Sequence, residues 1–333
     1  MRRSITRRPR VATPALAACL LALLAGCGGG GGGEDPLARS GAGSSNLSTA
    51  AAPADKGRPG GPSGSNGVRL EAETGDLLGS DKPNMLRGTD ADDVLRGQGG
   101  HDVLFALGGN DWLYGGSDRD RMVGGPGDDQ YLVEDADDQV VERDGEGTDH
   151  VHTTVSFTLP EHVENLSAHP EAPGPFVLTG NELANHIVGS PFSYDTIYGL
   201  GGDDVLEGGG RHGAMLDGGE GRDRLIVSFG ELRGGPGADT FVAAGRGAHT
   251  SPEVPVTVLD FNAAEGDRIE IPHVQTTATS AELFVTGKLR FDPVTSTLVL
   301  DLQPTVGGVD QVMVLEGVKE FNPAWVTVGT PKP

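Results

Sequence analysis

Large apolar residues recur every nine positions between residues 79 and 132. Written in rows of nine, this stretch has an eighth column that holds Leu86, Leu95, Leu104, Leu113, Met122 and Tyr131. A period of nine fits neither an α-helix nor one alternating strand. It predicts a six-residue turn followed by a three-residue strand whose middle side chain points inward. The residues expected in the resulting thin core are Leu95, Leu104 and Leu113, and those expected to face outward are Val94, Val103 and Trp112.

Two further columns keep the same nine-residue phase. The sixth column holds Asn84, Asp93, Asp102, Asp111, Asp120 and Asp129, and the first holds Gly88, Gly97, Ala106, Gly115 and Gly124. Glycine permits positive φ and lets main-chain carbonyl groups come close to another atom, as tight turns require. No glutamate occurs between residues 79 and 132. Because a solvated acidic face would mix Asp and Glu freely, these aspartates are expected to have a specific role.

The rows resemble the nonapeptide of the RTX (repeats-in-toxin) family, Gly-Gly-x-Gly-x-Asp-x-U-x, in which U is a large apolar residue. The resemblance implies an all-β fold, a parallel β-roll or β-solenoid in which two nonapeptides make one turn. Residues two rows apart then stack on the same edge. It also implies several bound Ca²⁺ ions, each taking about six to eight oxygen ligands at about 2.3–2.6 Å. Without the ions, each aspartate column would be a row of like charges.

Two segments outside the regular rows are expected to form other β structure. Residues 133–179 resemble the β-rich spacer that separates RTX blocks, and residues 243–333 are expected to cap the roll. Within the cap, residues 255–272 resemble the closing strands that follow such blocks. Lys288–Asp292 and Leu298–Leu302 flank a Pro-Val-Thr-Ser turn and are predicted to be strands. A cap is needed because an exposed strand edge would template aggregation.

The roll is therefore expected in two blocks, 68–132 and 180–242. In the second block, alternate rows place four polar residues on one edge, namely Asn185, Asp204, Asp223 and Asp239. The other edge has Asp195 and then Gly213, where an aspartate is expected. We therefore expect this second edge to be largely free of metal. The aspartates predicted to bind calcium are Asp93, Asp102, Asp111, Asp120, Asp129, Asp195, Asp204, Asp223 and Asp239.

The N-terminus carries an export signal. Residues 1–10 contain five arginines, and an Ala- and Leu-rich run follows up to Ala25. This run is shorter than the ~20 apolar residues of a membrane-spanning helix and is typical of a secretory signal peptide. It ends in Leu-Ala-Gly before Cys27, which resembles the bacterial lipobox and implies acylation of Cys27 after removal of residues 1–26. Residues 27–67, rich in Gly, Ser and Pro, are expected to be a disordered linker.

Composition narrows the possible partners. The chain has 54 glycines, 5% aromatic residues and a formal net charge of −23, from 48 acidic and 25 basic residues. Such a charge disfavours nucleic acid and anionic lipid headgroups and favours divalent cations. The two cysteines, Cys19 and Cys27, both lie near the N-terminus, so the folded part has no structural disulfide. A metal is the obvious alternative staple.

The sequence thus predicts a non-enzymatic calcium-binding lipoprotein of the cell envelope, at the outer membrane and facing the periplasm or the cell surface. It contains neither a His-Glu-x-x-His zinc motif nor a Gly-x-Ser-x-Gly nucleophile elbow. Two alternatives stay open: a hydrolase or toxin with an active site on the roll or spacer, and an adhesin for carbohydrate or another cell. Trp112 and Tyr114 would be the adhesin's contact residues, and a protein partner is not identified. His150 and His152 are interpreted as surface histidines, because a third zinc ligand is missing.

The lipobox assignment gives the first testable prediction. Replacement Cys27→Ser should abolish incorporation of a labelled fatty acid into the protein, because the serine hydroxyl does not replace the thiol as the acyl acceptor. Metabolic labelling of cells that express each form would measure this. Labelling that persists in the serine variant would refute the assignment.

Overall fold

The computed structural model describes residues 68–71, 75–210, 212–244, 255–272, 278–300 and 311–329. These residues belong to one compact unit, Ser48–Pro333. The signal peptide, Cys27 and the whole of the linker predicted from the sequence lie outside the described residues. Among the described helices, none is long and apolar enough to cross a membrane.

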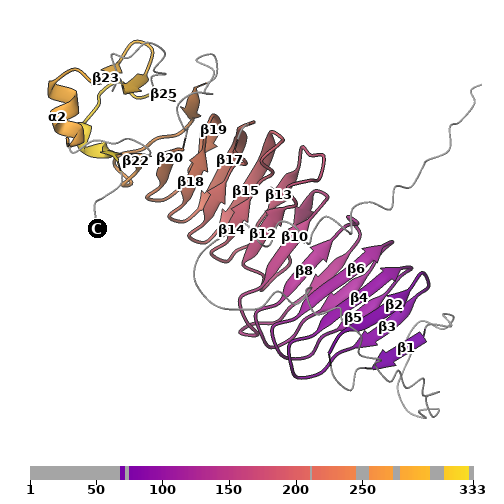
Figure 1. The fold of residues 1–333 in the computed structure, drawn as a ribbon. Coiled ribbons are helices and arrows are strands. Elements are labelled where there is room, and N and C mark those ends of the chain that lie inside the picture. Colours follow the sequence, from indigo (N-terminus) through magenta and orange to yellow (C-terminus); the bar gives the residue numbers. More distant parts are fainter. Residues whose placement is uncertain are drawn as a thin grey trace, which may run out of the picture. The chain divides into compact units, whose positions relative to one another are not determined.

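The described strands form three sheets (Figure 1). The sheet of twelve parallel strands contains, in order, β2 (Leu77–Ser80), β4 (Val94–Gly99), β6 (Trp112–Ser117), β8 (Gln130–Val133), β10 (His150–Thr153), β12 (Asn165–Ala168), β14 (His186–Val188), β16 (Val205–Glu207), β18 (Arg224–Val227), β20 (Thr240–Ala243), β22 (Arg268–Ile271) and β26 (Val326–Val328). The five-stranded sheet contains β1 (Val68–Glu71), β3 (Asn84–Arg87), β5 (Val103–Phe105), β7 (Arg121–Val123) and β9 (Gln139–Val141). The nine-stranded sheet contains β11 (Phe157–Thr158), β13 (Val177–Thr179), β15 (Asp195–Gly201), β17 (Ala214–Glu220), β19 (Gly230–Arg233), β21 (Val256–Val258), β25 (Gln311–Leu315), β24 (Thr297–Leu300) and β23 (Leu289–Asp292).

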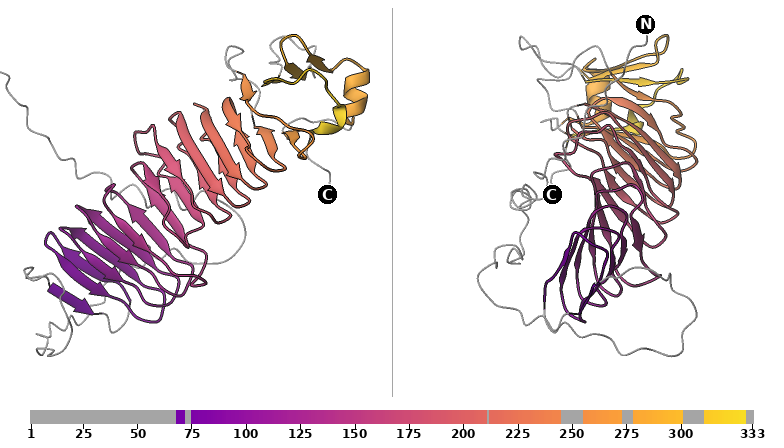
Figure 2. Two further views of the ribbon diagram at one scale, coloured as in Figure 1. Left: turned by 180° about the vertical axis from the view of Figure 1, so that it is seen from behind. Right: turned by 90° about the vertical axis from the view of Figure 1, so that its right-hand side faces the viewer.

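From β1 to β22, successive strands along the chain alternate between the two walls of the roll, and strands of one wall stack in parallel (Figure 2). Leu86 of β3 lies beside Leu104 of β5, and Leu95 of β4 lies beside Leu113 of β6. These four side chains are fully buried. The all-β parallel roll predicted from the nine-residue pattern is therefore confirmed, together with its core.

The three residues predicted to face outward do lie on the outer faces of their strands, but one of them, Val94, is buried. Val103 and Trp112 are half-buried on the outer faces of their strands. Val94 lies beside Trp112 in the strand register and is only 6% exposed. The alternation of side chains along a strand fixes which face a residue occupies, but neighbours on that face decide how much of it water reaches.

The segment predicted to be a spacer continues the twelve-stranded sheet without a break. β10 pairs with β8 on one side and with β12 on the other, and β12 pairs with β14 of the second block. The nine-residue stacking also continues beyond residue 132, because Val140 of β9 lies beside Met122 of β7. In the second block, some rows have ten or seven residues in place of nine. These changes alter the turn length and leave the strand register intact, so Leu206 still lies beside Leu225.

The opposite wall is interrupted between β9 and β11. These strands lie in consecutive turns of the chain, yet in the described part no strand pairing joins them. A cavity of about 540 Å³ opens there, lined by residues that include Gln139, Val141, Phe157 and Thr179. In the described part, one wall of the roll is thus interrupted within the predicted spacer and the other is continuous, and the division into two blocks stays a prediction.

The C-terminal cap combines strands with a short helix. β25 adds to β21 in parallel, and β24 and β23 then form an antiparallel hairpin on it, in agreement with the predicted strands. Helix α2 (Ser280–Val285), not expected from the sequence, begins with a capping box between Thr279 and Glu282. The short 3₁₀ helix η2 (Pro323–Trp325) precedes β26.

The core arrangement makes a prediction about β5. Leu104→Ala should destabilise the roll by about 2–5 kcal/mol, because its side chain is fully buried between the two walls. The matched control Val103→Ala, on the outer face of the same strand, should cost less than Leu104→Ala. Urea unfolding of both variants at one fixed Ca²⁺ concentration would measure the difference. Equal losses would contradict the assignment of faces.

Candidate metal centre

The column-six aspartates lie at the corners where turns enter strands. Each one directly precedes its strand, as Asp93 precedes β4 and Asp102 precedes β5. Carboxylates at such positions are ordinarily solvated, yet those of the first block are at most 2% exposed: Asp93, Asp102, Asp111, Asp120 and Asp129. The roll therefore carries lines of buried acids along its edges.

Hydrogen bonds join the aspartates into two columns. Asp102 Oδ1 accepts the Asn84 N–H at 2.7 Å, and Asp120 Oδ1 accepts the Asp102 N–H at 2.8 Å. On the other edge, Asp111 Oδ1 accepts the Asp93 N–H at 2.7 Å, and Asp129 Oδ1 accepts the Asp111 N–H at 2.8 Å. Each bond joins residues 18 apart, so the predicted stacking of residues two rows apart is confirmed.

One oxygen of most of these carboxylates has no partner. The buried atoms without a hydrogen bond include Oδ2 of Asp102, Asp111, Asp120, Asp129, Asp204, Asp223 and Asp239, and Oδ1 of Asp93. In Asp93 the oxygen without a partner is Oδ1, because Oδ2 accepts the Thr89 N–H and the Thr89 hydroxyl. A buried charged group without a partner is costly, so this regular set of free oxygens marks a place for cations or protons.

The column-one glycines leave room beside these oxygens. A Cβ atom on Gly97 would collide with Asp102 Oδ2 and with the main-chain carbonyl oxygen of Gly115. A Cβ on Gly199 would collide in the same way with Asp204 Oδ2 and the Gly218 carbonyl oxygen. Carboxylate and carbonyl oxygens of successive turns thus converge at these two glycines. An oxygen-only donor set of this kind fits Ca²⁺, which prefers hard oxygen ligands in flexible geometry.

Burial and mutual repulsion disfavour the charged form of these acids. Burial, together with repulsion from the neighbouring column carboxylates, raises the pKa of Asp111 and of Asp120 to about 7. Burial likewise raises the pKa of Asp129 to about 8, with Asp111, Glu142 and Asp149 contributing repulsion. In the second block, burial raises the pKa of Asp204 and of Asp239 to about 7. Without a cation, protons are therefore the alternative occupants of the columns.

The second block keeps one column of this kind. Asn185 donates its N–H to Asp204 Oδ1 at 2.7 Å, and the column continues through Asp223 and Asp239 with bonds of 2.9 Å. Asp267 of the closing strands extends it, because its Oδ1 accepts the Asp239 N–H at 3.0 Å. Its Oδ2 accepts the Asn262 N–H, so Asp267 ends the column without a free oxygen.

Asp195, on the other edge of the second block, differs from the rest of the predicted ligands. Its Oδ2 accepts the Ser190 N–H at 2.6 Å, and its Oδ1 accepts the Phe176 N–H and the Ser193 hydroxyl. Both oxygens are thus already bound within the chain, which does not favour a ligand role. That this edge is largely free of metal stays a prediction.

Three acids that belong to the first block's columns were not predicted. Asp138 Oδ1 accepts the Asp120 N–H at 2.9 Å and extends one column. Asp149 Oδ1 accepts the Asp129 N–H at 2.8 Å and extends the other column. Glu142 lies close to both Asp129 and Asp149. Continuing the rows of nine into residues 133–141 would have found Asp138 in column six. Two inserted residues shift Asp149 out of phase, so the row pattern contains no signal for it.

These pKa values predict opposite pH dependences with and without Ca²⁺. The folded ion-free carboxyls hold protons up to about pH 7, whereas in the unfolded chain Asp loses its proton near pH 4. Unfolding therefore releases protons in this window, and stability in chelator should fall between about pH 5 and about pH 8. The apparent affinity for Ca²⁺ should rise over the same range, because protons compete for its oxygens. Urea unfolding midpoints in chelator at about pH 5 and about pH 8 would measure the trend in stability, and Ca²⁺ titrations at the same two pH values would measure the trend in affinity. Midpoints that do not change with pH would contradict the predicted loss of stability.

Comparison with known proteins agrees with this geometry. Residues 78–113, 97–131 and 179–210 match the RTX calcium-binding nonapeptide repeat. Among solved structures, the extracellular lipase LipA from Serratia marcescens is similar at 15% identity over 79% of this chain, with a TM-score of 0.20; the match spans only 42% of the lipase chain. No curated protein sequence gives a significant match. The chain therefore contains RTX calcium-binding nonapeptide repeats, and these repeats form the stacked aspartate columns.

Proposed function

We propose that this protein is a non-enzymatic calcium-binding lipoprotein whose roll is folded or stabilised by Ca²⁺ at the cell envelope. The observation that carries the proposal is the regular series of buried carboxylate oxygens without partners along the edges of the roll. The series follows the matched repeats and continues at Asp223 and Asp239, beyond the last matched residue. Such a series stabilises a fold only when positive charge lies between successive turns.

The chain's own residues would hold the ions in a repeated way. In each interval of a column, two stacked aspartates present carboxylate oxygens, and the glycine turn presents main-chain carbonyl oxygens. Bound Ca²⁺ would supply the charge that neutralises both aspartates and would link one turn of the roll to the next. Because the unfolded chain lacks this arrangement, the free energy of ion binding becomes free energy of folding.

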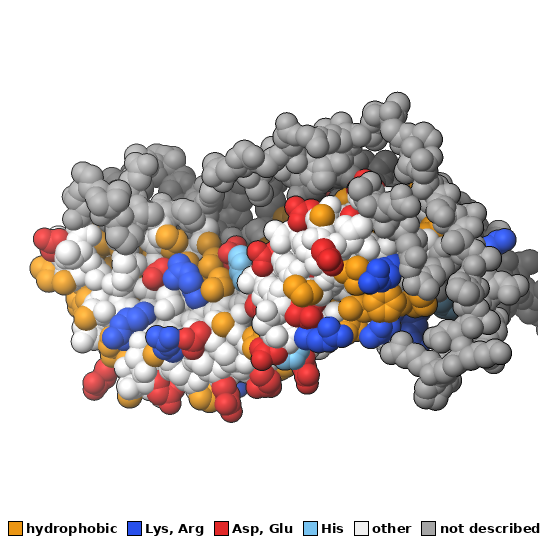
Figure 3. Space-filling view, turned by 90° about the horizontal axis from the view of Figure 1, so that it is seen from below, with side chains coloured by type: hydrophobic (Ala, Val, Ile, Leu, Met, Phe, Trp, Pro, Cys, Tyr) orange, Lys and Arg blue, Asp and Glu red, His pale blue; other side chains and the backbone are white. Residues whose placement is uncertain are grey.

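The same chemistry and the N-terminal sequence support a location at the cell envelope. Extracellular calcium modules typically bind at about 10⁻⁴–10⁻³ M, a concentration found outside the cytoplasm. The signal peptide and Cys27 would export the chain and tether it by lipid, and residues 28–67 would hold the roll away from the membrane. The sequence has a formal net charge of −23, and on the face drawn in Figure 3 acidic side chains gather along one edge. This surface disfavours nucleic acid as a partner.

The absence of catalysis is supported by the chemistry of the cavity between β9 and β11. An active site needs converging nucleophiles, acids or bases. Among the residues that line this cavity, Asp138 is the only titratable one, and its Oδ1 is engaged by the Asp120 N–H. The described residues therefore do not favour a hydrolase site at this cavity.

The ring geometry of Trp112 and Tyr114 does not favour an adhesin that binds sugars. The Trp112 ring stacks on Tyr114 on one side, with centroids 5.9 Å apart, and on His152, with centroids 5.8 Å apart. The Arg96 guanidinium lies over the Tyr114 ring at 5.0 Å. A sugar that stacks on an aromatic residue needs a free ring face, and in this row neighbouring side chains occupy those faces.

Circular dichroism tests the coupling of calcium to folding. The purified protein should have low strand content in excess EGTA near neutral pH and should gain strand content as Ca²⁺ rises to about 10⁻³ M. Mg²⁺ at the same ionic strength is the control and should not replace Ca²⁺, because it is smaller and retains its water ligands. Equal strand content with EGTA and with Ca²⁺ would refute calcium-coupled folding.

A further inference from the structure

The first block ends at a slip in the nine-residue phase. Asp129 and Asp149 are neighbours in one column although they are 20 residues apart, whereas the preceding neighbours are 18 apart. The strands nevertheless stay in register, since Tyr131 of β8 lies beside Val151 of β10. The inserted residues therefore lie in the turn between β9 and β10, and this turn begins with Glu142 in the place of a column-one glycine.

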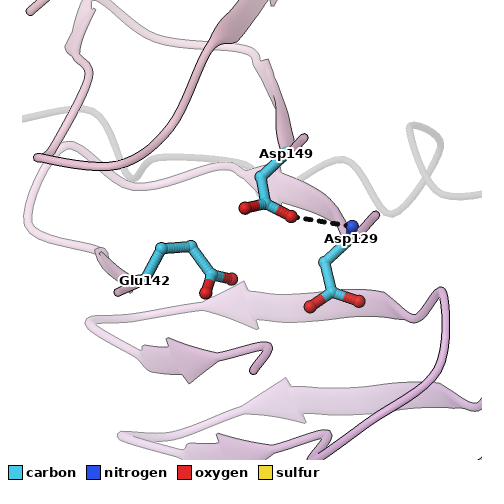
Figure 4. A group of neighbouring side chains, drawn as sticks. All are labelled: Asp129, Glu142 and Asp149. Carbon is cyan, nitrogen blue, oxygen red and sulfur yellow. Dashed lines mark hydrogen bonds between the residues drawn. The ribbon is translucent and has the colours of Figure 1, made fainter. Parts of the chain in front are cut away.

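Three acidic side chains converge at this slip. One carboxylate oxygen each from Asp129, Glu142 and Asp149 lies within 4.8 Å of the other two. Figure 4 shows Glu142 pointing from the end of β9 toward the two aspartates. The Asp129 N–H donates to Asp149 Oδ1 at 2.8 Å. Within the described part of the chain, this is the one place where three such groups meet closely enough to share an ion.

Two of these side chains are buried with an oxygen that has no partner. Asp129 is fully buried and Glu142 is 7% exposed, and neither Asp129 Oδ2 nor Glu142 Oε2 has a hydrogen bond. The other Glu142 oxygen, Oε1, accepts the Tyr131 hydroxyl, which fixes the direction of the side chain. Ligands at about 2.3–2.6 Å from a central Ca²⁺ lie up to about 5 Å from one another, so the observed spacing fits one ion.

We propose that Asp129, Glu142 and Asp149 hold one Ca²⁺ ion more tightly than the repeat intervals do, at a site that the nonapeptide pattern does not contain. A repeat interval offers two carboxylates and a glycine, whereas the slip offers a third carboxylate in the glycine's place. Calcium affinity rises with the number of charged ligands. The inference rests on the proposed function, because it takes the repeats to bind the same cation.

The position of this site gives the ion a structural task. Glu142 directly follows β9, the last strand of the five-stranded sheet, while Asp129 and Asp149 precede β8 and β10 of the continuous sheet. An ion shared by the three acids would tie the end of the interrupted wall to the wall that continues. It would thus close the first block at the point where β9 has no following strand to pair with among the described residues.

Calorimetric titration of the full chain with Ca²⁺ tests the site. Glu142→Gln keeps the size of the side chain and removes its charge, so it should weaken one tight ion by about tenfold or more and leave the weaker class unchanged. Asp144→Asn is the matched control, because it removes one exposed carboxylate from the same turn. If the two variants bind Ca²⁺ alike, the proposed site is overturned.

A second measurement does not depend on the glutamine variant folding. Tb³⁺ takes the same oxygen ligands as Ca²⁺ and luminesces when a nearby tyrosine transfers energy to it. Tyr131, in contact with Glu142, should excite an ion at this site, so Tyr131→Phe should remove most of the emission from the first equivalent of Tb³⁺. Tyr198→Phe, in β15 of the second block, should not. Unchanged emission in Tyr131→Phe would also overturn the proposal.

The outcomes separate this inference from the proposed function. A wild-type chain that takes up no Ca²⁺ would end both. Normal uptake by the wild type, with Glu142→Gln indistinguishable from Asp144→Asn, would leave the repeats as calcium sites and remove only the site at the slip.

Discussion

The structure depends on buried carboxylates that lie one above another. Most column aspartates use one oxygen to hold the N–H of the residue two rows earlier and keep the other free. The hydrogen bond fixes the stacking of the turns. The free oxygen leaves a buried negative charge that no other group among the described residues neutralises. A roll of this kind is stable only with protons or cations along its edges, which connects its fold directly to its ligand.

The thin core explains why the ions matter so much. In the first block, most strands contribute a single large apolar side chain to the core, such as Leu104 of β5 and Leu113 of β6. Several later strands contribute a second one, as Val227 of β18 and Ile271 of β22 do. A larger globular core would bury more apolar surface per residue and would stand without a staple. Here the cations would take the place that disulfides hold in many exported proteins, because neither cysteine lies in the folded part.

The length of the turns can vary in this architecture without disturbing the columns. Intervals of 18, 19 and 20 residues all bring a carboxylate oxygen to the N–H of its column neighbour. Extra residues enter the turns, where main-chain groups can reach water, and the strands keep their register because one inward side chain per strand must meet the core. The same tolerance lets Glu142 enter the turn at the slip and approach Asp129 and Asp149.

The sequence by itself determined the period, the roll, the inward leucines and the two aspartate columns of the first block. It did so because a strict nine-residue repeat makes each row an equal structural unit. Only the tertiary structure showed that the twelve-stranded sheet runs through the expected spacer, that Asp149 extends a column, and that both oxygens of Asp195 are engaged. Where insertions break the phase, neighbours along an edge are set by strand pairing across the roll, and that pairing is not a local property of the chain.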